Sequence, residues 1–340
     1  MNTTDQKLLV FIRLTLLALC CLAGTVAGAA TVPDAGQGQG DHRQAALPVE
    51  YLKVQGLHRS ARFYRPARPA AHPALLLVLH GSGGDGERIR RMTGFSFDRL
   101  ADAQGLVVAY PDALGGQWHD CRAGAPYHGA LKGVDDSAFL RAVTERARDM
   151  TGGELGDVYA IGYSNGGHLV FRLALETPGD FAAFAVIGAH LPVPGENDCR
   201  ASGRPVSIMM VSGTADPINP WAGGAVRLPG GGTPGRVRSA TGTAGYFREL
   251  AGMSREAEVV PLPDRDPRDG TRVEMRRWSG EAGNEVALMV VRGGGHSLPD
   301  PAAAFPAAIV GRTSRDVSGA AEIWRFFSRH STPGRVTTAD

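Results

Sequence analysis

Six short apolar segments recur along the 340-residue chain, and helix-like patterns separate them. They cover residues 74–80, 106–110, 157–163, 182–188, 206–212 and 285–291. Short buried strands that alternate with amphipathic helices are typical of a largely parallel sheet with helices on both faces. We therefore predict one α/β domain over residues 51–332, followed by a short tail at 333–340.

Two of the intervening segments have a clear helical period. Their apolar stripes consist of Phe139, Leu140, Val143 and Ala147 in residues 135–150, and of Ala321, Trp324 and Phe327 in residues 318–330. Such a stripe faces the core of a globular protein, so we expect these aromatic side chains to pack inside rather than contact a cofactor. Ahead of the first apolar segment, residues 51–66 alternate around a turn at 56–59, which predicts an antiparallel hairpin.

The N-terminus has the pattern of a secretory signal peptide. An apolar stretch within residues 1–30 ends in small residues, which allows cleavage after Ala29 or Ala30. Arg13 interrupts the apolar run, and this argues against a membrane-spanning anchor. Residues 31–50 are expected to form a flexible lead-in, because most of them are polar or glycine. The sequence thus predicts a secreted or periplasmic protein.

The cysteines bear on both export and stability. Cys20 and Cys21 lie in the leader, and a lipid-modified Cys20 is the alternative to cleavage, although Leu19 stands where such sites favour a small residue. After the leader is removed, Cys121 and Cys199 have one possible intramolecular pairing in an oxidising compartment. We predict that disulfide, with two buried thiols as the alternative.

The charge of the chain limits its partners. The formal net charge is +2, and the basic cluster at 88–91 is expected to be solvated surface. Nucleic acid is therefore not expected as a partner, and no protein partner is implied. No pair of metal-ligand residues has helical or Cys-x-x-Cys spacing, so we expect neither a metal nor a cofactor.

The apolar segment that begins at residue 75 ends in a glycine-rich loop with two interpretations. Gly81, Gly83 and Gly86 fit the spacing of a dinucleotide-binding loop, with Asp112 as a candidate ribose acid. The same loop fits an oxyanion hole, because both functions need exposed backbone N–H groups where a strand ends. The loop alone does not decide between a redox enzyme and a hydrolase.

A second motif, Gly162-Tyr163-Ser164-Asn165-Gly166, lies between a strand-like and a helix-like segment. A serine on such a sharp turn is exposed for nucleophilic attack, and the turn requires small residues two positions away on either side. The start of the helix also directs its N–H groups and the positive end of its dipole at the reacting centre. Ser164 is therefore the candidate nucleophile.

A serine nucleophile needs a histidine base and a carboxylate that orients the histidine. Asp216 and His296 follow Ser164 in the order expected of this arrangement, each just past a later strand. The rival acids lie in a polar segment that no strand delivers: Asp264, Asp266 and Asp269. The rival bases do not fit the order and are expected to be structural or to line the cleft: His80, His119, His128, His168 and His190.

These candidates favour the hydrolase interpretation of the glycine-rich loop. The dinucleotide alternative leaves the serine, the acid and the histidine unexplained, and it places a costly cofactor outside the cell. In the hydrolase interpretation, the backbone N–H of Ser82 or Gly83 and that of Asn165 form the oxyanion hole, where the loss of one donor typically costs ~10²–10³ in rate.

With these residues in place, the chain resembles the esterase family of polyhydroxybutyrate depolymerases, feruloyl esterases and acetylxylan esterases in the α/β-hydrolase superfamily. The likeness covers residues 74–330 and rests on motifs in family order: HGSGG, WHDCR, GVDDSAFL, GYSNGG, GTADPINPW, GGGHSLP and GRTSRDVSGAAEIWRFF. The resemblance implies the α/β-hydrolase fold, esterase activity and a triad of Ser164, Asp216 and His296.

The resemblance also implies that Trp118 and Trp221 line the substrate cleft, with simple packing as the alternative. We expect Tyr163 and Leu298 to line it as well. Leu298 takes a place that the family often fills with tryptophan, which leaves open the width of the acyl or alcohol pocket. Neither a Thr-rich linker nor an extra C-terminal module is recognised, so soluble esters or oligomers are expected as better substrates than a crystalline surface.

Two loops at the mouth of the predicted site contain the cysteines. A bridge between Cys121 and Cys199 would restrain the pocket as well as the fold, so reduction is expected to lower activity before it unfolds the protein. The glycine-rich stretch at 222–239 is expected to be a loop or insertion, and the sequence leaves open whether it caps the cleft.

The sequence therefore predicts an exported serine esterase that acts on small or oligomeric carboxylic esters without a cofactor. The candidate substrates are hydroxyalkanoate oligomers of the polyhydroxybutyrate type, feruloyl esters and acetyl esters. A peptidase or an acyltransferase with the same triad is one alternative, because pocket shape chooses the substrate. A non-catalytic binding protein on a hydrolase scaffold is the other.

Overall fold

The computed structural model describes residues 45–331. The predicted signal peptide, the predicted tail and residues 31–44 of the predicted lead-in lie outside these residues. The end of the lead-in was placed too far along the chain, because residues 49 and 50 already belong to the first strand. The described residues form one compact unit that contains all the candidate site residues.

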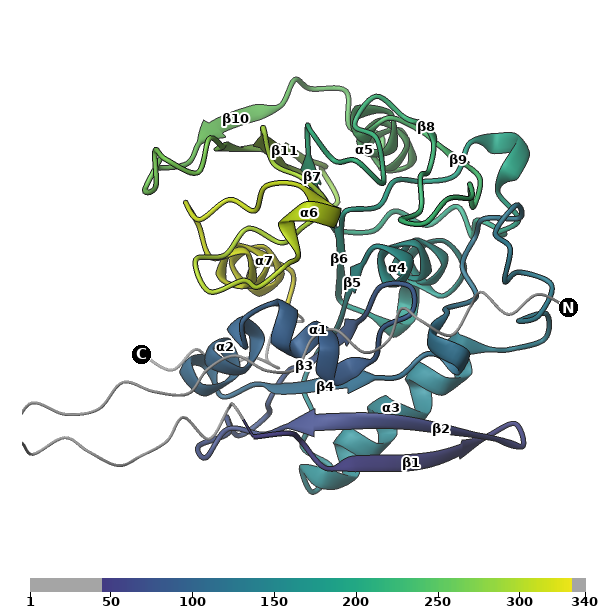
Figure 1. Cartoon of the computed structure of the whole chain (residues 1–340). Helices are drawn as coiled ribbons and strands as arrows, with labels where there is room; N and C mark the ends of the chain where they lie inside the picture. Colours follow the sequence, from purple (N-terminus) through teal and green to yellow (C-terminus); the bar gives the residue numbers. More distant parts are fainter. Residues whose placement is uncertain (1–44, 332–340) are drawn as a thin grey trace, which may run out of the picture. The chain divides into compact units, whose positions relative to one another are not determined.

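A ten-stranded sheet forms the centre of this unit (Figure 1). In the order in which the strands lie side by side, they are β1 Val49–Val54, β2 Leu57–Tyr64, β4 Val107–Pro111, β3 Leu75–Leu79, β5 Val158–Tyr163, β6 Ala183–Ile187, β7 Ile208–Gly213, β12 Glu285–Arg292, β11 Arg272–Ser279 and β10 Glu258–Pro261. The six strands from β4 to β12 in this order run parallel, and antiparallel strands extend the sheet on both sides.

The six predicted apolar segments are the six parallel strands. β3, β4, β6 and β7 consist of buried residues throughout, and β5 and β12 have one less buried residue each. Strands that are covered on both faces lose the alternation of polar and apolar residues, which is why they were visible in the sequence as short apolar runs. The α/β fold class is confirmed.

The sequence analysis missed β10 and β11. β11 alternates charged and apolar residues, and β10 carries mostly exposed ones, because both lie toward one edge of the sheet. The hairpin of β1 and β2 at the opposite edge is confirmed. Its turn consists of Gln55 and Gly56, both with positive φ, rather than residues 56–59. Two such residues match the twist that a tight hairpin requires.

Helices cover both faces of the sheet. Apolar residues of α3 Asp136–Met150, α4 Asn165–Glu176 and α5 Ala240–Leu250 pack on one face, with Leu75, Leu77 and Leu79 of β3. Residues of α1 Gly86–Met92, α2 Ser96–Gln104 and α7 Gly319–Phe327 pack on the other, with Leu76 and Val78. Alternate residues of one strand thus belong to two different cores, as the period of a strand requires.

One of the two predicted helical stripes is confirmed. Phe139, Leu140, Val143 and Ala147 are all buried on α3. On α7 the predicted stripe is confirmed for Phe327 but wrong for Ala321 and Trp324: the buried apolar side chains are Ala320, Ile323, Phe326 and Phe327. Trp324 is only half-buried, and its indole N–H donates to Gln104 Oε1 at 3.2 Å near the surface.

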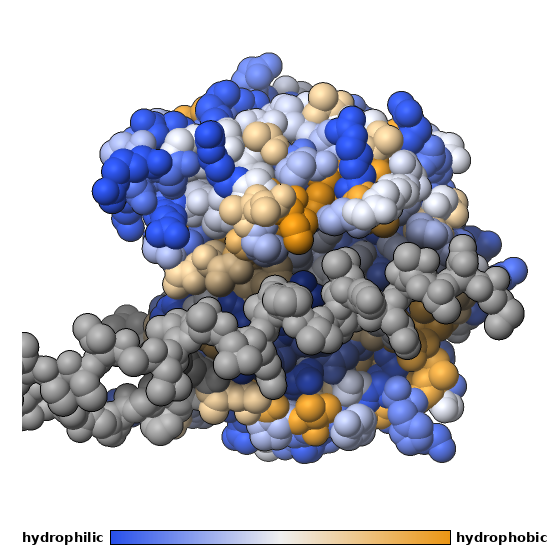
Figure 2. All heavy atoms as spheres, in the orientation of Figure 1, coloured by the Kyte–Doolittle hydropathy of each residue, from blue (hydrophilic) through white to orange (hydrophobic). Residues whose placement is uncertain are grey.

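None of the helices within residues 45–331 combines the length and the apolar character needed to cross a bilayer. The visible face of the unit is mostly hydrophilic (Figure 2). A patch of apolar side chains interrupts it in the area of the short helix α6 Ala307–Val310 (Figures 1 and 2).

Candidate active site

Ser164 lies on the sharp turn between β5 and α4, with φ 55° and ψ −116°. A Cβ on Gly162 would lie 2.2 Å from the carbonyl oxygen of Gly166, and a Cβ on Gly166 would lie 2.5 Å from that of Leu79. Real Cβ atoms do not approach backbone oxygens so closely. The strand, the turn and the helix therefore meet only because both flanking positions are glycine, as the sequence predicted.

The loop after β3 contains the predicted oxyanion donors. In the described part of the chain, neither the backbone N–H of Ser82 nor that of Asn165 has a hydrogen-bond acceptor. The N–H of Gly83, in contrast, donates to the carbonyl of Gly116 at 2.8 Å. Gly83 is therefore not available as a donor, and Ser82 is the remaining candidate in this loop.

His80 fixes the conformation of this loop. Its Nδ1 lies 2.7 Å from Gly81 O, and its Nε2 lies 3.0 Å from the backbone N–H of Ala113, which can only donate. His80 therefore carries its proton on Nδ1 and uses both ring nitrogens for backbone contacts. Burial lowers the pKa of His80, although its bond to Gly81 opposes the shift. With both ring nitrogens bonded to the backbone, His80 holds the loop in place and does not act as a base.

Asp216 and His296 come together at the carboxyl ends of β7 and β12. His296 Nδ1 lies 2.7 Å from Asp216 Oδ2, and both side chains are almost fully buried. The other carboxylate oxygen, Oδ1, accepts the backbone N–H groups of Ile218 and Asn219 at 2.7 and 2.8 Å. The carboxylate thus has partners on both oxygens, and His296 Nε2 is buried without a hydrogen-bond partner in the part of the chain that the structure describes.

Ser164 and His296 line the same cavity, which has a volume of about 370 Å³. Tyr163, next to Ser164, donates its hydroxyl to the carbonyl of His296 at 3.0 Å and so ties the two loops together. Gly188 faces the imidazole: a Cβ there would lie 2.8 Å from His296 Nδ1. Among residues 45–331, the cavity is thus lined by Ser164, by His296 and by Ser82, whose backbone N–H has no acceptor; Asn165, the other candidate donor, directly follows Ser164 in the chain.

Comparisons with known proteins agree with this geometry. The chain is 31% identical over 288 residues to NocK of Nocardia uniformis subsp. tsuyamanensis, which is named as an esterase, and the match covers 81% of each chain. It belongs to this esterase family. Two more distant relatives are named as an acetylxylan esterase/xylanase and a feruloyl esterase.

Other matches of this esterase are more distant. It is 29% identical over 173 residues to the bifunctional acetylxylan esterase/xylanase XynS20E of Neocallimastix patriciarum, a match that covers 50% of the chain and 23% of that relative. The acetyl xylan esterase of Aspergillus awamori has a similar fold, with a TM-score of 0.54, 15% identity and coverage of 83% of this chain and 99% of that one. No protein-family model matches the sequence.

The esterase does not use all the residues that were predicted to line its cleft. Tyr163 lines the cavity, but Trp118, Trp221 and Leu298 do not, and these three predictions are wrong. Trp118 is fully buried and donates its indole N–H to His80 O at 2.9 Å, so it supports the oxyanion loop from behind. Packing, the alternative for the tryptophans, is what the structure shows.

Leu298 and Trp221 also pack against core residues. Leu298 is fully buried, and its Cδ1 would lie 2.4 Å from a Cβ on Gly319, the first residue of α7. Trp221 is half-buried and packs against the core residues on the α4 side of the sheet.

The cavity instead has an aliphatic lining that the sequence analysis missed. Apart from Tyr163, its apolar side chains come from four segments: Ile89 and Met92 of α1, Ile218 of the loop after β7, Leu228 and Pro229 of the glycine-rich stretch, and Pro306, Ile309 and Val310 around α6. The glycine-rich stretch contains a short antiparallel pair, β8 Gly224–Ala225 with β9 Arg236–Val237, and it borders the cavity rather than extending away from it.

The rival candidates are engaged elsewhere. Asp112 accepts from Gly86 N–H, Ser60 Oγ and Arg62 Nη1 at 2.7 to 2.9 Å, so it braces the start of α1 and is not free to bind a ribose. The rival acids lie between β10 and β11 and bind neighbouring groups there: Asp264 pairs with Arg272, Asp266 accepts from Arg268, and Asp269 accepts from Thr271 and Arg315. His168 and His190 are buried, and burial lowers the pKa of each.

The predicted disulfide is present between Cys121 and Cys199, so the alternative of two free thiols is wrong. It connects the loop after β4 with the loop after β6. Asp120, next to Cys121, accepts from Asn165 Nδ2 at 2.6 Å and pairs with Arg122 at 2.6 Å. The disulfide-bonded loop is thereby linked directly to one of the two candidate oxyanion donors.

Proposed function

We propose that this esterase hydrolyses carboxylic esters with Ser164 as nucleophile, His296 as general base and Asp216 as the group that orients His296. The observation that carries the proposal is the buried ion pair of Asp216 and His296. His296 Nε2 has no hydrogen-bond partner among the described residues, and His296 lines the same cavity as Ser164. Asp216 fixes the tautomer with the proton on Nδ1, so Nε2 presents its lone pair.

In the proposed reaction, Ser164 Oγ attacks the ester carbonyl carbon while His296 Nε2 accepts the hydroxyl proton. The negative charge that develops on the carbonyl oxygen is stabilised by the backbone N–H groups of Ser82 and Asn165. His296 returns the proton to the leaving alcohol, and the acyl group remains on Ser164. Water, activated by the same imidazole, then releases the acid.

The cavity lining favours aliphatic acyl groups. Its side chains are mostly those of isoleucine, leucine, methionine, valine and proline, and Tyr163 contributes the only carbocyclic aromatic ring among the described residues that line it. A feruloyl group would meet little aromatic surface for stacking. Among the three ester classes expected from the sequence, hydroxyalkanoate oligomers of the polyhydroxybutyrate type fit this lining best.

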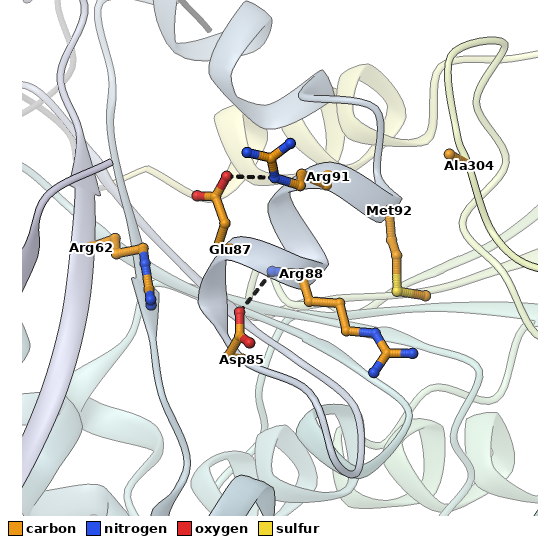
Figure 3. A pocket seen from close by; sticks show the side chains of 7 residues that line it. All are labelled: Arg62, Asp85, Glu87, Arg88, Arg91, Met92 and Ala304. Carbon is orange, nitrogen blue, oxygen red and sulfur yellow. Dashed lines mark hydrogen bonds and ion pairs between the residues drawn. The ribbon is translucent and has the colours of Figure 1, made fainter. Parts of the chain in front are cut away.

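Arg88 adds a charge preference. It lines the cavity beside Ser164 as well as the neighbouring pocket shown in Figure 3, where its guanidinium lies apart from the carboxylates of Asp85 and Glu87. Within residues 45–331 this guanidinium has no ion pair, and no carboxylate lines the catalytic cavity. We therefore propose esters that carry a free carboxylate, such as linear hydroxyalkanoate oligomers, as substrates.

Export through an N-terminal signal peptide is part of the proposal. The disulfide between Cys121 and Cys199 supports it, because such bonds form and persist in oxidising compartments.

The test compares wild-type protein, Ser164→Ala and the remote exposed variant Ser254→Ala. Initial rates are measured on 3-hydroxybutyrate oligomers, methyl ferulate, acetylated xylan oligomers and short p-nitrophenyl esters. Ser164→Ala is expected to lower kcat by more than about 10⁴-fold and to abolish labelling by a fluorophosphonate, while folding remains normal. Unchanged hydrolysis in Ser164→Ala would refute the nucleophile, and a preference for methyl ferulate would refute the substrate class.

A further inference from the structure

A second cluster of chemically active side chains lies away from the catalytic cavity, at the disulfide. His119, His128 and Asp198 each bring one potential ligand atom within 4.8 Å of the others. His128 Nε2 and Asp198 Oδ2 are already 3.1 Å apart. We propose that these three residues form a binding site for a divalent transition-metal ion, with Zn²⁺ as the best fit.

His119 has the hydrogen bonding expected of a metal ligand. Its Nδ1 lies 3.2 Å from the carbonyl oxygen of Val134, which can only accept, so this nitrogen carries the proton. Its Nε2 is buried and has no hydrogen-bond partner among the described residues. Histidines that bind a metal through one nitrogen usually donate the other N–H to a carbonyl or carboxylate, which fixes the tautomer and the ring.

The backbone already holds the two ligand loops together. The disulfide joins Cys121, two residues after His119, to Cys199, the residue after Asp198. The N–H of Asp198 donates to Cys121 O at 3.1 Å, and the N–H of Ala123 donates to Glu196 O at 3.0 Å. Preformed spacing removes much of the ordering cost that a metal site otherwise imposes on flexible loops.

The ligand chemistry selects the kind of ion. Two imidazoles and one carboxylate suit Zn²⁺ and related transition ions, whereas Ca²⁺ and Mg²⁺ require oxygen ligands. Three protein ligands leave a fourth position for water. His128 and Asp198 have side chains that are 28% and 31% exposed, so the ion has a path from solvent, and the two side chains can move to close the coordination distances.

The local charge is compatible with a cation. Arg172 lies 3.8 Å from the far oxygen of Asp198, but it also lies 3.5 Å from the carboxylate of Glu176. Two carboxylates against one guanidinium leave a net negative charge beside the imidazoles. The sequence expectation of no metal site missed this cluster because its ligands come from two loops that only the fold and the disulfide bring together.

The experiment titrates Zn²⁺ into untagged, chelator-treated full-length mature protein by calorimetry, with Ca²⁺ and Mg²⁺ as comparison ions. We expect each chain to bind one Zn²⁺ ion saturably, and far more tightly than it binds Ca²⁺ or Mg²⁺. His128→Gln and Asp198→Asn are each expected to weaken Zn²⁺ binding at least about tenfold. The matched control is His72→Gln, which removes an exposed histidine that pairs with Glu154 at 2.9 Å; its affinity for Zn²⁺ should not change.

Co²⁺ provides a measurement that does not depend on variants. Bound to wild-type protein, it is expected to give the visible absorption of a low-coordinate nitrogen and oxygen site, and Zn²⁺ should displace it. The proposal is overturned if wild-type protein shows no saturable Zn²⁺ binding up to about 1 mM, if His128→Gln and Asp198→Asn bind as tightly as wild type, or if His72→Gln weakens binding equally. Because no readout involves ester hydrolysis, failure here leaves the proposed triad untouched.

Discussion

Two functional regions of this esterase are held in place in different ways. The catalytic edge, as we name the residues of the proposed site (80–84, 164–166, 216 and 296), lies where parallel strands end. The linked loops, residues 118–131 and 194–199, are held by the disulfide and a few backbone hydrogen bonds. The comparison teaches that close packing of backbone stabilises the first region, whereas a covalent bond stabilises the second.

The largest expected effect contrasts one glycine from each region. Gly166→Ala should prevent folding or cost more than about 4 kcal/mol of unfolding free energy, because its Cβ would lie 2.5 Å from Leu79 O. Helix propensity predicts the opposite sign, since alanine usually favours a helix by ~1 kcal/mol over glycine. Gly129→Ala, in the linked loops, has no atom within 4 Å of the new Cβ and should change stability by no more than about 0.5 kcal/mol.

Urea denaturation followed by circular dichroism measures both variants. Equal stability of Gly166→Ala and Gly129→Ala would contradict this prediction, because it would show that the backbone around Gly166 can shift to accept a Cβ at little cost in free energy.

Removal of the disulfide should have the next largest effect. The bridge closes a loop with a sequence separation of 78 residues, and the Cys121→Ser, Cys199→Ser double variant is expected to lose about 2–4 kcal/mol of unfolding free energy. Activity should fall at temperatures where the variant is still folded, because Asp120 in the linked loops holds the side chain of Asn165. Paired melting curves and ester hydrolysis rates test this; if activity persists until the protein unfolds, the coupling between the two regions is refuted.

Acid should destabilise the catalytic edge through buried histidines. Burial lowers the pKa of His190 to about 4, while an unfolded histidine titrates near 6.5. Between these values the unfolded chain binds the proton and the folded chain does not, so stability is full above pH 6.5 and falls as the pH drops toward 4. The loss from His190 is about 3 kcal/mol, and burial of His168 and His80 lowers the pKa of each in the same direction.

Urea midpoints at pH 7 and pH 4.5 measure this dependence. His190→Asn should be less stable at pH 7 but should lose less stability on acidification than wild type. An unchanged difference between the two pH values would exclude His190 as a source of acid sensitivity.

The smallest expected effect concerns surface charge. Arg88→Gln should raise KM for a 3-hydroxybutyrate trimer with a free carboxylate by about fivefold to tenfold, as expected for one partly exposed ion pair. The methyl ester of the same trimer should be hydrolysed as before. The matched control is Arg200→Gln, which removes an exposed arginine directly after the linked loops. An equal rise in KM for the acid and its methyl ester would contradict carboxylate recognition by Arg88.

The sequence could predict the catalytic edge because its residues are local to strands. Ser164, Asp216 and His296 each follow an apolar run directly, and parallel strands bring their carboxyl ends to one edge. The fold class was predictable from the alternation of apolar and amphipathic segments, and the disulfide from the two cysteines that follow the leader. Asp216 and His296 lie 2.7 Å apart because β7 and β12, the strands before them, are neighbours in the sheet.

The remaining features depend on how loops fold back, which spacing does not encode. The family resemblance placed Trp118 and Leu298 at the cleft, yet both side chains are buried in the core. The aliphatic part of the cavity lining comes from α1, α6, the loop after β7 and the glycine-rich stretch, which are far apart in the sequence. The charged strand β11, next to the edge strand β10, was not predicted because its exposed and buried residues alternate and give no continuous apolar run.

The glycine-rich stretch at 222–239 separates specificity from reactivity. It places Leu228 and Pro229 at the cavity, yet it contains none of the proposed triad and follows the loop that holds Asp216. Lengthening such a segment costs little, because the entropy of loop closure grows only slowly with loop length. Evolution, or an engineer, can therefore exchange this stretch to admit a different ester while the chemical machinery is inherited unchanged.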